Sequence, residues 1–574
     1  MKRHILSLAL GAAILAPVGA AADAGRAERG TTAAYLIAKT AERHSAYARA
    51  SAAWRVVLAG PHYSQEIAER AIANAVNAGD MAGAIVLSRD LAARGRGSQI
   101  AALALTVDMA ERGAWAELSA SLADGLSVGP LVNGLAKGWA AVGLGDRAVA
   151  EDAFDAVAAT PGLRTFGLMH KAYALAVFGD DAAAEVVWAT GNGGKPLRLS
   201  RDSAFARILG LARSGRAAAA LAILDKLFDQ GRDAEAAAVR AAILTGDLPA
   251  PAIAGAKEGI VETLFAVASA LKGEATDGYT LLYTRAATHL APAHSPALVL
   301  QAQLLGDLGL HEDALAAWRE VPAGRSWTTA RLGAAEALRA LGRKDEAIGL
   351  LSQLAATGTA PDRVHVALAD ALTESGRLDE ALAAYGSAIE AARPGDVSWR
   401  TFYARGVALE GAGHWDAAKA DLRRALRAAP EEPSILNYLG YAMAKRGEAL
   451  NEALRLVETA AAASPDSGRI ADSMGWILHR MGRHELAVEH MERAVSLLPG
   501  DAVANEHLGD GYWAVGRERE ARFQWRRALA FAADPREAAR LRAKMEDGPA
   551  AQPAEAARIA EIEPRSELAA TIGN

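Results

Sequence analysis

The six residues Gly376-Arg377-Leu378-Asp379-Glu380-Ala381, GRLDEA, return along the chain as near-copies. A catalytic site does not occur six times in one chain, so the motif marks a structural element that repeats. The near-copies are GLHEDA from Gly309, GRKDEA from Gly342, GHWDAA from Gly413, GRHELA from Gly482 and GREREA from Gly516.

The glycines that open the motif have a regular spacing. In the C-terminal half, including Gly447, successive glycines are 33, 34, 37, 34, 35 and 34 residues apart. At Gly447 the alanine comes six residues later instead of five, which is a one-residue insertion in GEALNEA. A fainter series runs from Gly79 to Gly215 with spacings of 34, 32, 34 and 36, followed by a gap of 58 to Gly273. A period near 34 residues is typical of a helical solenoid, and the gap indicates one degenerate or rebuilt unit.

Each residue type in the motif has a physical role at a helix-turn-helix elbow. Glycine ends the first helix, because it adopts the left-handed C-terminal cap without strain. The acidic residues that follow suit the first turn of a second helix, where the helix dipole favours negative charge. The alanine fits a close crossing of the two helices. GRLDEA therefore recurs because each hairpin needs one elbow.

Other positions repeat in the same register. When the elbow alanine is numbered 20, position 8 is a small residue: Ala302, Ala335, Ala369, Gly406, Gly440, Gly475 and Gly509. Position 24 is large: Trp318, Leu351, Tyr385, Leu422, Val457, Met491 and Trp525. Position 27 is alanine in the last five units: Ala388, Ala425, Ala460, Ala494 and Ala528. This pattern resembles the tetratricopeptide repeat family, most closely from about 295 to 535.

The resemblance implies an all-α superhelical solenoid of helix-turn-helix hairpins. We expect degenerate repeats over 23–290, well-matched repeats over 291–533, a capping helix over 534–546 and a disordered tail over 547–574. Asp534-Pro535 is a typical helix start, with an N-cap residue followed by proline. GDLPAPAIAG, near 246–255, interrupts the helical pattern.

The N-terminus resembles a secretory signal peptide over 1–22. Lys2, Arg3 and His4 are followed by an apolar run from Ile5 to Ala16 and by Ala20-Ala21-Ala22, which suits cleavage before Asp23. An uncleaved anchor or a cytosolic helix is the alternative. The chain has no cysteine, which excludes disulfides, thiolate metal sites and a lipid-modified cysteine. We expect an exported periplasmic protein with no membrane span after signal cleavage.

The sequence offers little catalytic chemistry. In HELAVEH, His484 and His490 are six residues apart and face opposite sides of a helix, unlike a zinc-protease pair. GNGGKP from Gly191 lacks the spacing and the hydroxyl residue of a phosphate-binding loop. The net charge of −6 does not favour nucleic acid. We therefore expect no enzyme activity, no cofactor, no metal and no nucleic-acid partner.

The resemblance implies a binding groove on the inner face of the first helices. Carried over to the best-matching units, the inward positions are Tyr403, Glu410, Asn437, Tyr441, Lys445, Arg469, Asp472, Trp476, His479, Arg480, Glu506, His507, Asp510 and Trp513. Aromatic residues and arginine dominate the energy of protein interfaces, so this composition suits a groove for a partner's peptide or helix. Packing of Trp476 and Trp513 between hairpins is the alternative interpretation.

Residues 430–530 also resemble exported proteobacterial envelope proteins with tetratricopeptide repeats, some of which present substrates to periplasmic proteases. That resemblance implies an envelope scaffold or adaptor with one or more envelope protein partners, including a protease and its substrate. Three alternatives stay open at this point: a self-associating structural spacer, an accessory protein of polysaccharide export or envelope assembly, and an enzyme with an unrecognised site.

Overall fold

The computed structural model describes residues 21–60, 63–191, 193–228, 233–251, 253–357, 360–393, 395–532 and 534–549. Within these ranges every regular element is a helix, apart from an isolated bridge between Lys272 and Ala275. The predicted all-α class is therefore confirmed. The expected signal peptide lies outside the described residues up to residue 20, and the expected tail lies outside them from 550 onward.

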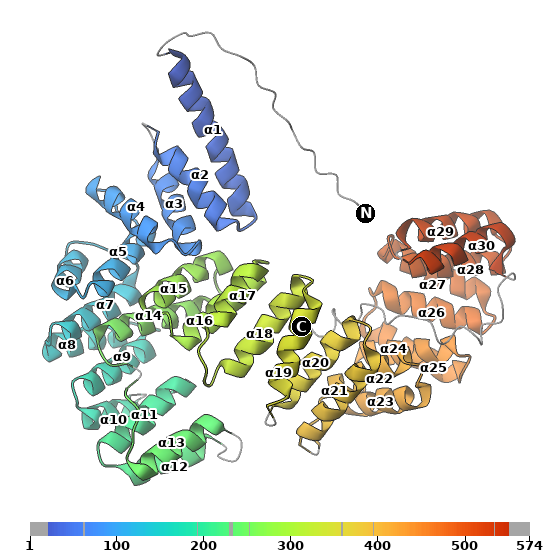
Figure 1. Ribbon diagram of the computed structural model, residues 1–574. Coiled ribbons are helices and arrows are strands. Elements are labelled where there is room, and N and C mark those ends of the chain that lie inside the picture. The colour runs from blue at the N-terminus through green and yellow to red at the C-terminus, as the bar shows by residue number, and fades with distance from the viewer. Residues whose placement is uncertain are drawn as a thin grey trace. The chain divides into compact units, whose positions relative to one another are not determined.

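The helices fall into two compact units, residues 1–337 and 338–574, which are described separately (Figure 1). The first unit contains α1 (Ala21–Arg43), α2 (Tyr47–Leu58), α3 (Gln65–Asn77), α4 (Met81–Ala93), α5 (Gln99–Glu111), α6 (Trp115–Ala123), α7 (Pro130–Gly143), α8 (Arg147–Ala159), α9 (Arg164–Val177), α10 (Asp181–Thr190), α11 (Arg201–Arg213), α12 (Ala217–Leu227), α13 (Ala234–Thr245), α14 (Ala256–Leu271), α15 (Asp277–Leu290), α16 (Ser295–Asp307) and α17 (His311–Glu320). The boundary between the units falls within α18 (Trp327–Ala340).

The second unit continues the same hairpins. It contains α19 (Lys344–Ala355), α20 (Asp362–Glu374), α21 (Leu378–Ala391), α22 (Trp399–Gly411), α23 (Trp415–Ala428), α24 (Pro433–Lys445), α25 (Leu450–Ala463), α26 (Gly468–Arg480), α27 (His484–Leu497), α28 (Ala502–Ala514), α29 (Glu518–Phe531) and α30 (Pro535–Asp547).

The predicted elbows have the geometry that the motif requires. Gly376 has a φ of +73°, and the N–H of Arg377 donates to the carbonyl oxygen of Leu372 at 2.9 Å, closing the end of α20. All thirteen repeat glycines have positive φ, including the faint series from Gly79 to Gly273. The elbow alanine Ala381 is fully buried. The weak N-terminal signal therefore marks real hairpins.

Positions 8 and 24 meet where the two helices of a hairpin cross. A Cβ atom at Gly475 would lie 2.5 Å from Cγ of Met491, and one at Gly440 would lie 2.7 Å from Cγ2 of Val457. Real Cβ contacts are not this short. Glycine at position 8 thus makes room for the large side chain of the second helix, as the repeat pattern predicts.

The one-residue insertion in GEALNEA changes the backbone conformation at a single residue. Ala449 adopts the left-handed conformation, with φ +41°, directly before α25. This places the extra residue in the turn, and Ala453 remains fully buried at the helix crossing. The hairpin packing is therefore kept at the cost of one strained backbone residue.

The rebuilt unit after Gly215 changes the path of the chain. α13 ends at Gly246, and α14 and α15 then turn back against α7, α5 and α3 (Figure 1). A Cβ at Gly259 of α14 would lie 2.0 Å from the fully buried indole of Trp139, so the two helices are in close contact. The side chain of Asn77 donates to the carbonyl oxygen of Gly278 at 2.9 Å. The first unit thus fills the inner face of its own early hairpins.

Candidate protein-binding groove

In the second unit the first helix of each hairpin lines the inner face. The first helices α24, α26 and α28 contact one another in succession, whereas successive second helices have no comparable contact among the described residues. An array is narrower on the side where its helices come closest, so the first helices form the concave side. The predicted site residues lie on α22, α24, α26 and α28.

The residues at the start of this face are mostly engaged within the chain. Tyr403 is 5% exposed, and its ring packs 5.8 Å from that of Tyr438, so it is a packing residue and not an open groove position. The Glu410 carboxylate accepts a hydrogen bond from Arg446 at 2.8 Å and lies 3.6 Å from Nζ of Lys445. Lys445 and Glu410 thus belong to one ion-pair cluster between α22 and α24.

Asn437 and Tyr441 are half-buried on α24, one turn apart. The side-chain oxygen of Asn437 is buried and has no hydrogen-bond partner among the described residues. The ring of Tyr441 lies 6.3 Å from that of His507. An amide with an unused hydrogen-bonding atom beside an aromatic ring suits contact with a partner's backbone.

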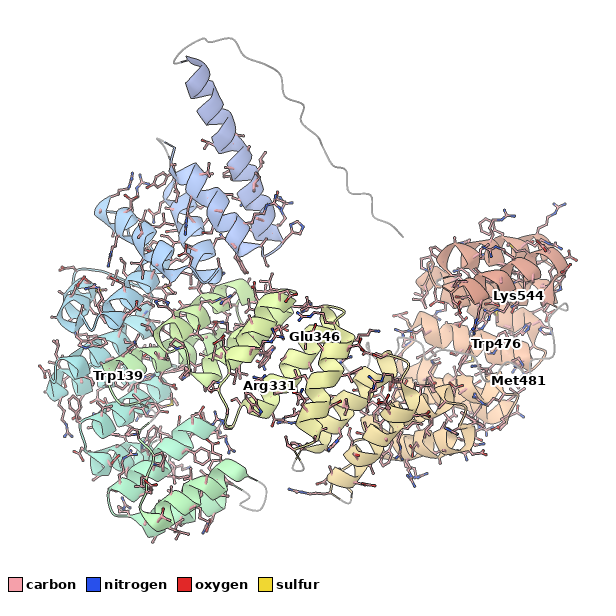
Figure 2. The ribbon with its side chains drawn as sticks, in the orientation of Figure 1. Trp139, Arg331, Glu346, Trp476, Met481 and Lys544 are labelled. Carbon is pink, nitrogen blue, oxygen red and sulfur yellow. The ribbon has the colours of Figure 1, made fainter. Side chains whose placement is uncertain are left out.

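Trp476 lies between two histidines. Its ring stacks on His507 at 4.3 Å and on His479 at 5.4 Å, with interplanar angles of 17° in both pairs. The indole N–H is buried and has no acceptor among the described residues. Trp476 is half-buried (Figure 2), so its side chain is both packed and reachable from the groove. Trp476 can therefore both pack between hairpins and contact a partner in the groove.

His479 and Arg480 follow Trp476 on α26. Burial lowers the pKa of His479 to about 4, with further lowering from nearby His484, His507, Arg480 and Lys544. His479 is therefore neutral at physiological pH. The guanidinium of Arg480 donates to the carbonyl oxygen of Lys445 at 3.1 Å and joins α26 to α24, whereas Arg469 is exposed at the start of α26.

Four predicted groove residues are internal contacts, which corrects their assignment as open surface. Asp472, Glu506, His507 and Asp510 are each between 5% and 8% exposed. The Nδ1 of His507 lies 3.0 Å from both carboxylate oxygens of Asp472, within hydrogen-bond distance. The indole N–H of Trp525 donates to Asp510 at 3.0 Å. The repeat pattern places these side chains on the inward face, but Asp472 contacts His507 of the next first helix there, and a further helix covers Glu506 and Asp510 of α28.

That further helix is α30, and its cations are site residues that the sequence analysis missed. The ammonium of Lys544 lies 2.6 Å from Glu506 and 2.6 Å from Asp510, and Arg540 pairs with Glu506. Lys544 is 6% exposed. The sequence does show two basic residues four positions apart on the predicted capping helix. It does not show their acidic partners, which lie about 35 residues earlier.

Trp513 also contacts the end of α30. A Cβ at Gly548 would lie 2.5 Å from the indole of Trp513, and the ring of Trp525 is 5.5 Å away. Arg522 lies over the indole at 5.1 Å. Packing is therefore the role that these contacts give Trp513.

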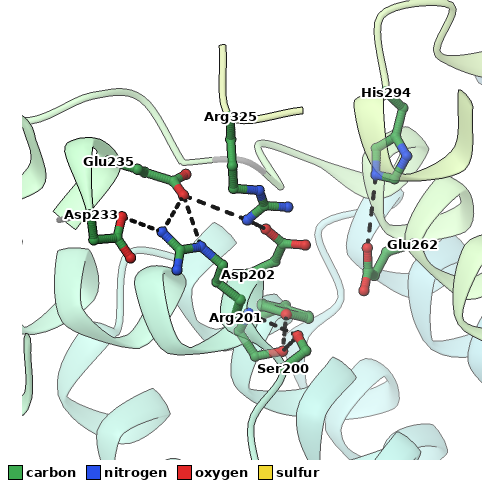
Figure 3. Close-up of polar contacts among 10 residues, drawn as sticks. Ser200, Arg201, Asp202, Asp233, Glu235, Glu262, His294 and Arg325 are labelled. Atoms are coloured by element: carbon green, nitrogen blue, oxygen red, sulfur yellow. Dashed lines mark hydrogen bonds and ion pairs between the residues drawn. The ribbon is translucent and has the colours of Figure 1, made fainter. Parts of the chain in front are cut away.

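A second polar cluster joins distant parts of the first unit (Figure 3). Arg201 of α11 pairs with Asp233 at 2.5 Å and with Glu235 at 2.9 Å, while Arg325 pairs with Asp202. These ion pairs connect the segment before α18 to α11 and α13. They fix the chain across the interrupted repeat.

Glu262 of α14 lies beside this cluster, 4.0 Å from Nε2 of His294 (Figure 3). Burial, with a smaller contribution from the charge of Asp202, raises the pKa of Glu262 to about 8. Burial lowers the pKa of His294. Both groups are therefore neutral near pH 7, so this contact is not an ion pair there.

The described residues contain no group of three or more His, Asp or Glu side chains placed to hold a metal ion. None of their helices has the length and apolar character needed to cross a membrane.

Comparison with known families agrees with the hairpin geometry. Models described as tetratricopeptide repeat match residues 332–397, 403–468 and 469–501. Within these segments the chain contains tetratricopeptide repeats. These matched repeats include most of the groove residues, from Tyr403 to Arg480, and such repeats serve as scaffolds for protein–protein interaction.

Individual relatives cover the chain to different extents. The TPR repeat-containing protein PA4667 of Pseudomonas aeruginosa is 32% identical over 200 residues, which are 34% of this chain and 33% of that protein. MamA from Desulfovibrio magneticus RS-1 is 19% identical, with a TM-score of 0.26 over 30% of this chain and 94% of its own. A chain of the APC/C hetero-tetramer Cut9–Hcn1 is 13% identical, with a TM-score of 0.38 over 90% of this chain and 96% of its own.

Proposed function

We propose that this protein is a non-catalytic scaffold of the bacterial cell envelope that binds a peptide or helix of a partner protein along the inner face of α24 and α26. The observation that carries the proposal is Trp476, a half-buried indole with an unused N–H on the concave side of tetratricopeptide repeats. Asn437, Tyr441 and Lys445 lie on the neighbouring first helix. Aromatic anchors with polar groups around them are the usual centre of an interface.

The envelope assignment rests on the N-terminal pattern of Lys2-Arg3-His4 followed by an apolar run. We further propose that the protein presents substrates to a periplasmic protease. A scaffold of 574 residues with two compact units has room for two partners, and holding both raises their effective concentration. Protease and substrate are then expected to purify together with the scaffold.

Affinity purification from an envelope extract, followed by mass spectrometry, tests the groove. The partner should be recovered with the wild-type chain and reduced about 10- to 30-fold with Trp476→Ala, the loss typical of an interface anchor. Phe523→Ala is the matched control, because Phe523 is an aromatic residue on the second helix α29 and is 55% exposed. Equal recovery with all three chains would place the binding site elsewhere.

One observation favours a second candidate, the self-associating spacer. Tyr35, Leu36 and Ile37 on α1 are 40%, 61% and 43% exposed, which leaves three apolar side chains in solvent around this helix. Exposed apolar side chains suit contact with a second copy. Light scattering over a range of concentrations distinguishes the two: oligomers that Leu36→Asp abolishes would favour the spacer.

A further inference from the structure

The last helix of the described residues, α30, buries few side chains and forms several ion pairs. Among its side chains only Leu541 and Lys544 are buried, whereas α28 has nine buried residues. Its ion pairs come from Arg540 and Lys544, which lie one helical turn apart and face Glu506 and Asp510, and Arg522 of α29 donates to the carbonyl oxygen of Met545. These acids are also one turn apart, so two pairs of opposite charge meet across the two helices.

The buried ion pairs of Lys544 with Glu506 and Asp510 fix how α30 docks on α28 but add little net stability. The side chains of Lys544, Glu506 and Asp510 are 7%, 7% and 10% exposed. Removing such charges from water costs about as much as their attraction returns, so a buried ion pair contributes little beyond apolar packing. Burial raises the pKa of Asp510, and the charge of Lys544 opposes this only in part. For Glu506 burial acts in the same direction, but Lys544 and Arg540 outweigh it and the pKa is lowered.

α30 also stands where the first helix of another repeat would stand. It packs against α29 in the way that α28 packs against the preceding second helix, α27. Gly548, directly after α30, lies against the indole of Trp513. Without α30, α28 would present two carboxylates one turn apart beside an aromatic ring. That surface is complementary to a helix with two basic residues at positions i and i+4.

We propose that α30 is a displaceable internal occupant, and that the face of α28 beneath it binds a partner helix carrying two basic residues one turn apart. α30 has the same chemistry as this partner and competes with it. The site is formed by Glu506, Asp510 and Trp513; it uses other side chains than the Trp476 surface, which it borders through His507. In the free chain, α30 lowers the apparent affinity for the partner by the fraction of molecules in which it is docked.

A labelled synthetic peptide of residues 534–548 serves as the probe, and the full chain is the receptor. Lys544→Glu in the chain brings a third negative charge against Glu506 and Asp510 and releases α30. This variant should bind the peptide on the order of tenfold more tightly than the wild-type chain, because the internal competitor is lost. Arg542→Glu is the matched control: it makes the same charge change on the exposed side of α30 and should bind as wild type does.

The controls separate release from unfolding. The same peptide carrying Lys544→Glu should not bind either chain. Hydrogen exchange should show α30 exposed and α28 still protected in the Lys544→Glu chain; if α28 also opens, Lys544→Gln gives the milder comparison. Equal peptide affinity for the wild-type and released chains would overturn the proposal. A concentration-dependent wild-type dimer that Lys544→Glu abolishes would overturn it too, by assigning the site to a second copy.

Discussion

The two units build the same hairpins but use their inner faces differently. In the first unit α14 and α15 cover the inner face of α3, α5 and α7, and Trp139 there is a core residue. In the second unit the corresponding faces of α24 and α26 keep half-buried polar and aromatic side chains, such as Tyr441 and Trp476. The elbow motif therefore determines the hairpin, while the first-helix residues determine whether its inner face becomes core or surface.

Among substitutions that add atoms, the largest expected effect comes from Gly259→Ala, which tests whether the first unit depends on its returning helices. A methyl group 2.0 Å from the buried Trp139 ring cannot be accommodated without moving α14 away from α7. We expect a loss of about 3 kcal/mol in the first unit, the upper end for overpacking. Hydrogen exchange should show lost protection in α14 and α7, with α24–α28 unchanged. Loss of protection in both units would contradict their independence.

The two units should also differ in how their stability depends on pH. Asp370 is buried, and its carboxylate accepts a hydrogen bond from Tyr385 at 2.5 Å. Burial raises its pKa from 3.8 to about 6, so the fold favours the protonated form. Its contribution is complete below about pH 4 and is lost as the pH rises through 6, a difference of about 2–3 kcal/mol. Asp370→Asn should remove this slope in α20 and α21, measured by exchange protection from pH 4 to 7.

The corresponding buried carboxyl group in the first unit is Glu262, and it affects stability over a wider pH range. Its pKa is raised from 4.5 to about 8, so stability is lost as the pH rises through this whole range. Glu262→Gln should therefore flatten the pH dependence of α14 up to pH 8 and leave that of α20 unchanged. A shared pH profile for both helices would contradict the separation.

A smaller, local effect is expected from Gly475→Ala in the second unit. The added Cβ would lie 2.5 Å from Cγ of Met491 and 3.0 Å from the carbonyl oxygen of Ala487; the methionine side chain can move, and the backbone must shift slightly. We expect a loss of about 1–2 kcal/mol, confined to α26, α27 and the neighbouring hairpins, since a repeat contacts only its neighbours. A shift in thermal midpoint as large as that of Gly259→Ala would show that the second unit is equally cooperative.

The smallest change should have the opposite sign. Gly386 lies in α21, and a Cβ there would meet nothing within 4 Å. Gly386→Ala should therefore stabilise that helix by about 0.5–1 kcal/mol through helix propensity alone. It serves as the control for both glycine variants, and a destabilised Gly386→Ala chain would invalidate the steric explanation.

The sequence predicts local structure well because the relevant signals lie within one repeat. The positive φ of Gly376, the buried Ala381 and the contact between Gly475 and Met491 all follow from the 34-residue pattern. The start of α30 at Asp534-Pro535 was readable for the same reason, since Asp534 caps the helix. Each of these features joins residues fewer than 20 positions apart.

Contacts between repeats were not predictable in this way. The fit of Gly259 against Trp139 joins residues 120 positions apart, and no residue type in either helix identifies its partner. Similarly, the inward direction of Glu506 and Asp510 follows from the repeat, but their burial depends on Lys544 in a helix outside it. The repeat pattern predicts the direction of a side chain. Contacts with residues far away in the sequence determine whether that side chain is exposed or buried.

The hydrogen bond from Asn77 to Gly278 also has a consequence for the order of folding. It joins residues 201 positions apart, so the ribosome needs roughly 10 to 40 seconds between making one and the other. During that time α3, α5 and α7 have no α14 and α15 to cover their inner face. The newly made first unit is therefore a substrate for chaperones and proteases until residue 290 has emerged, whereas the hairpins of the second unit close as they are made.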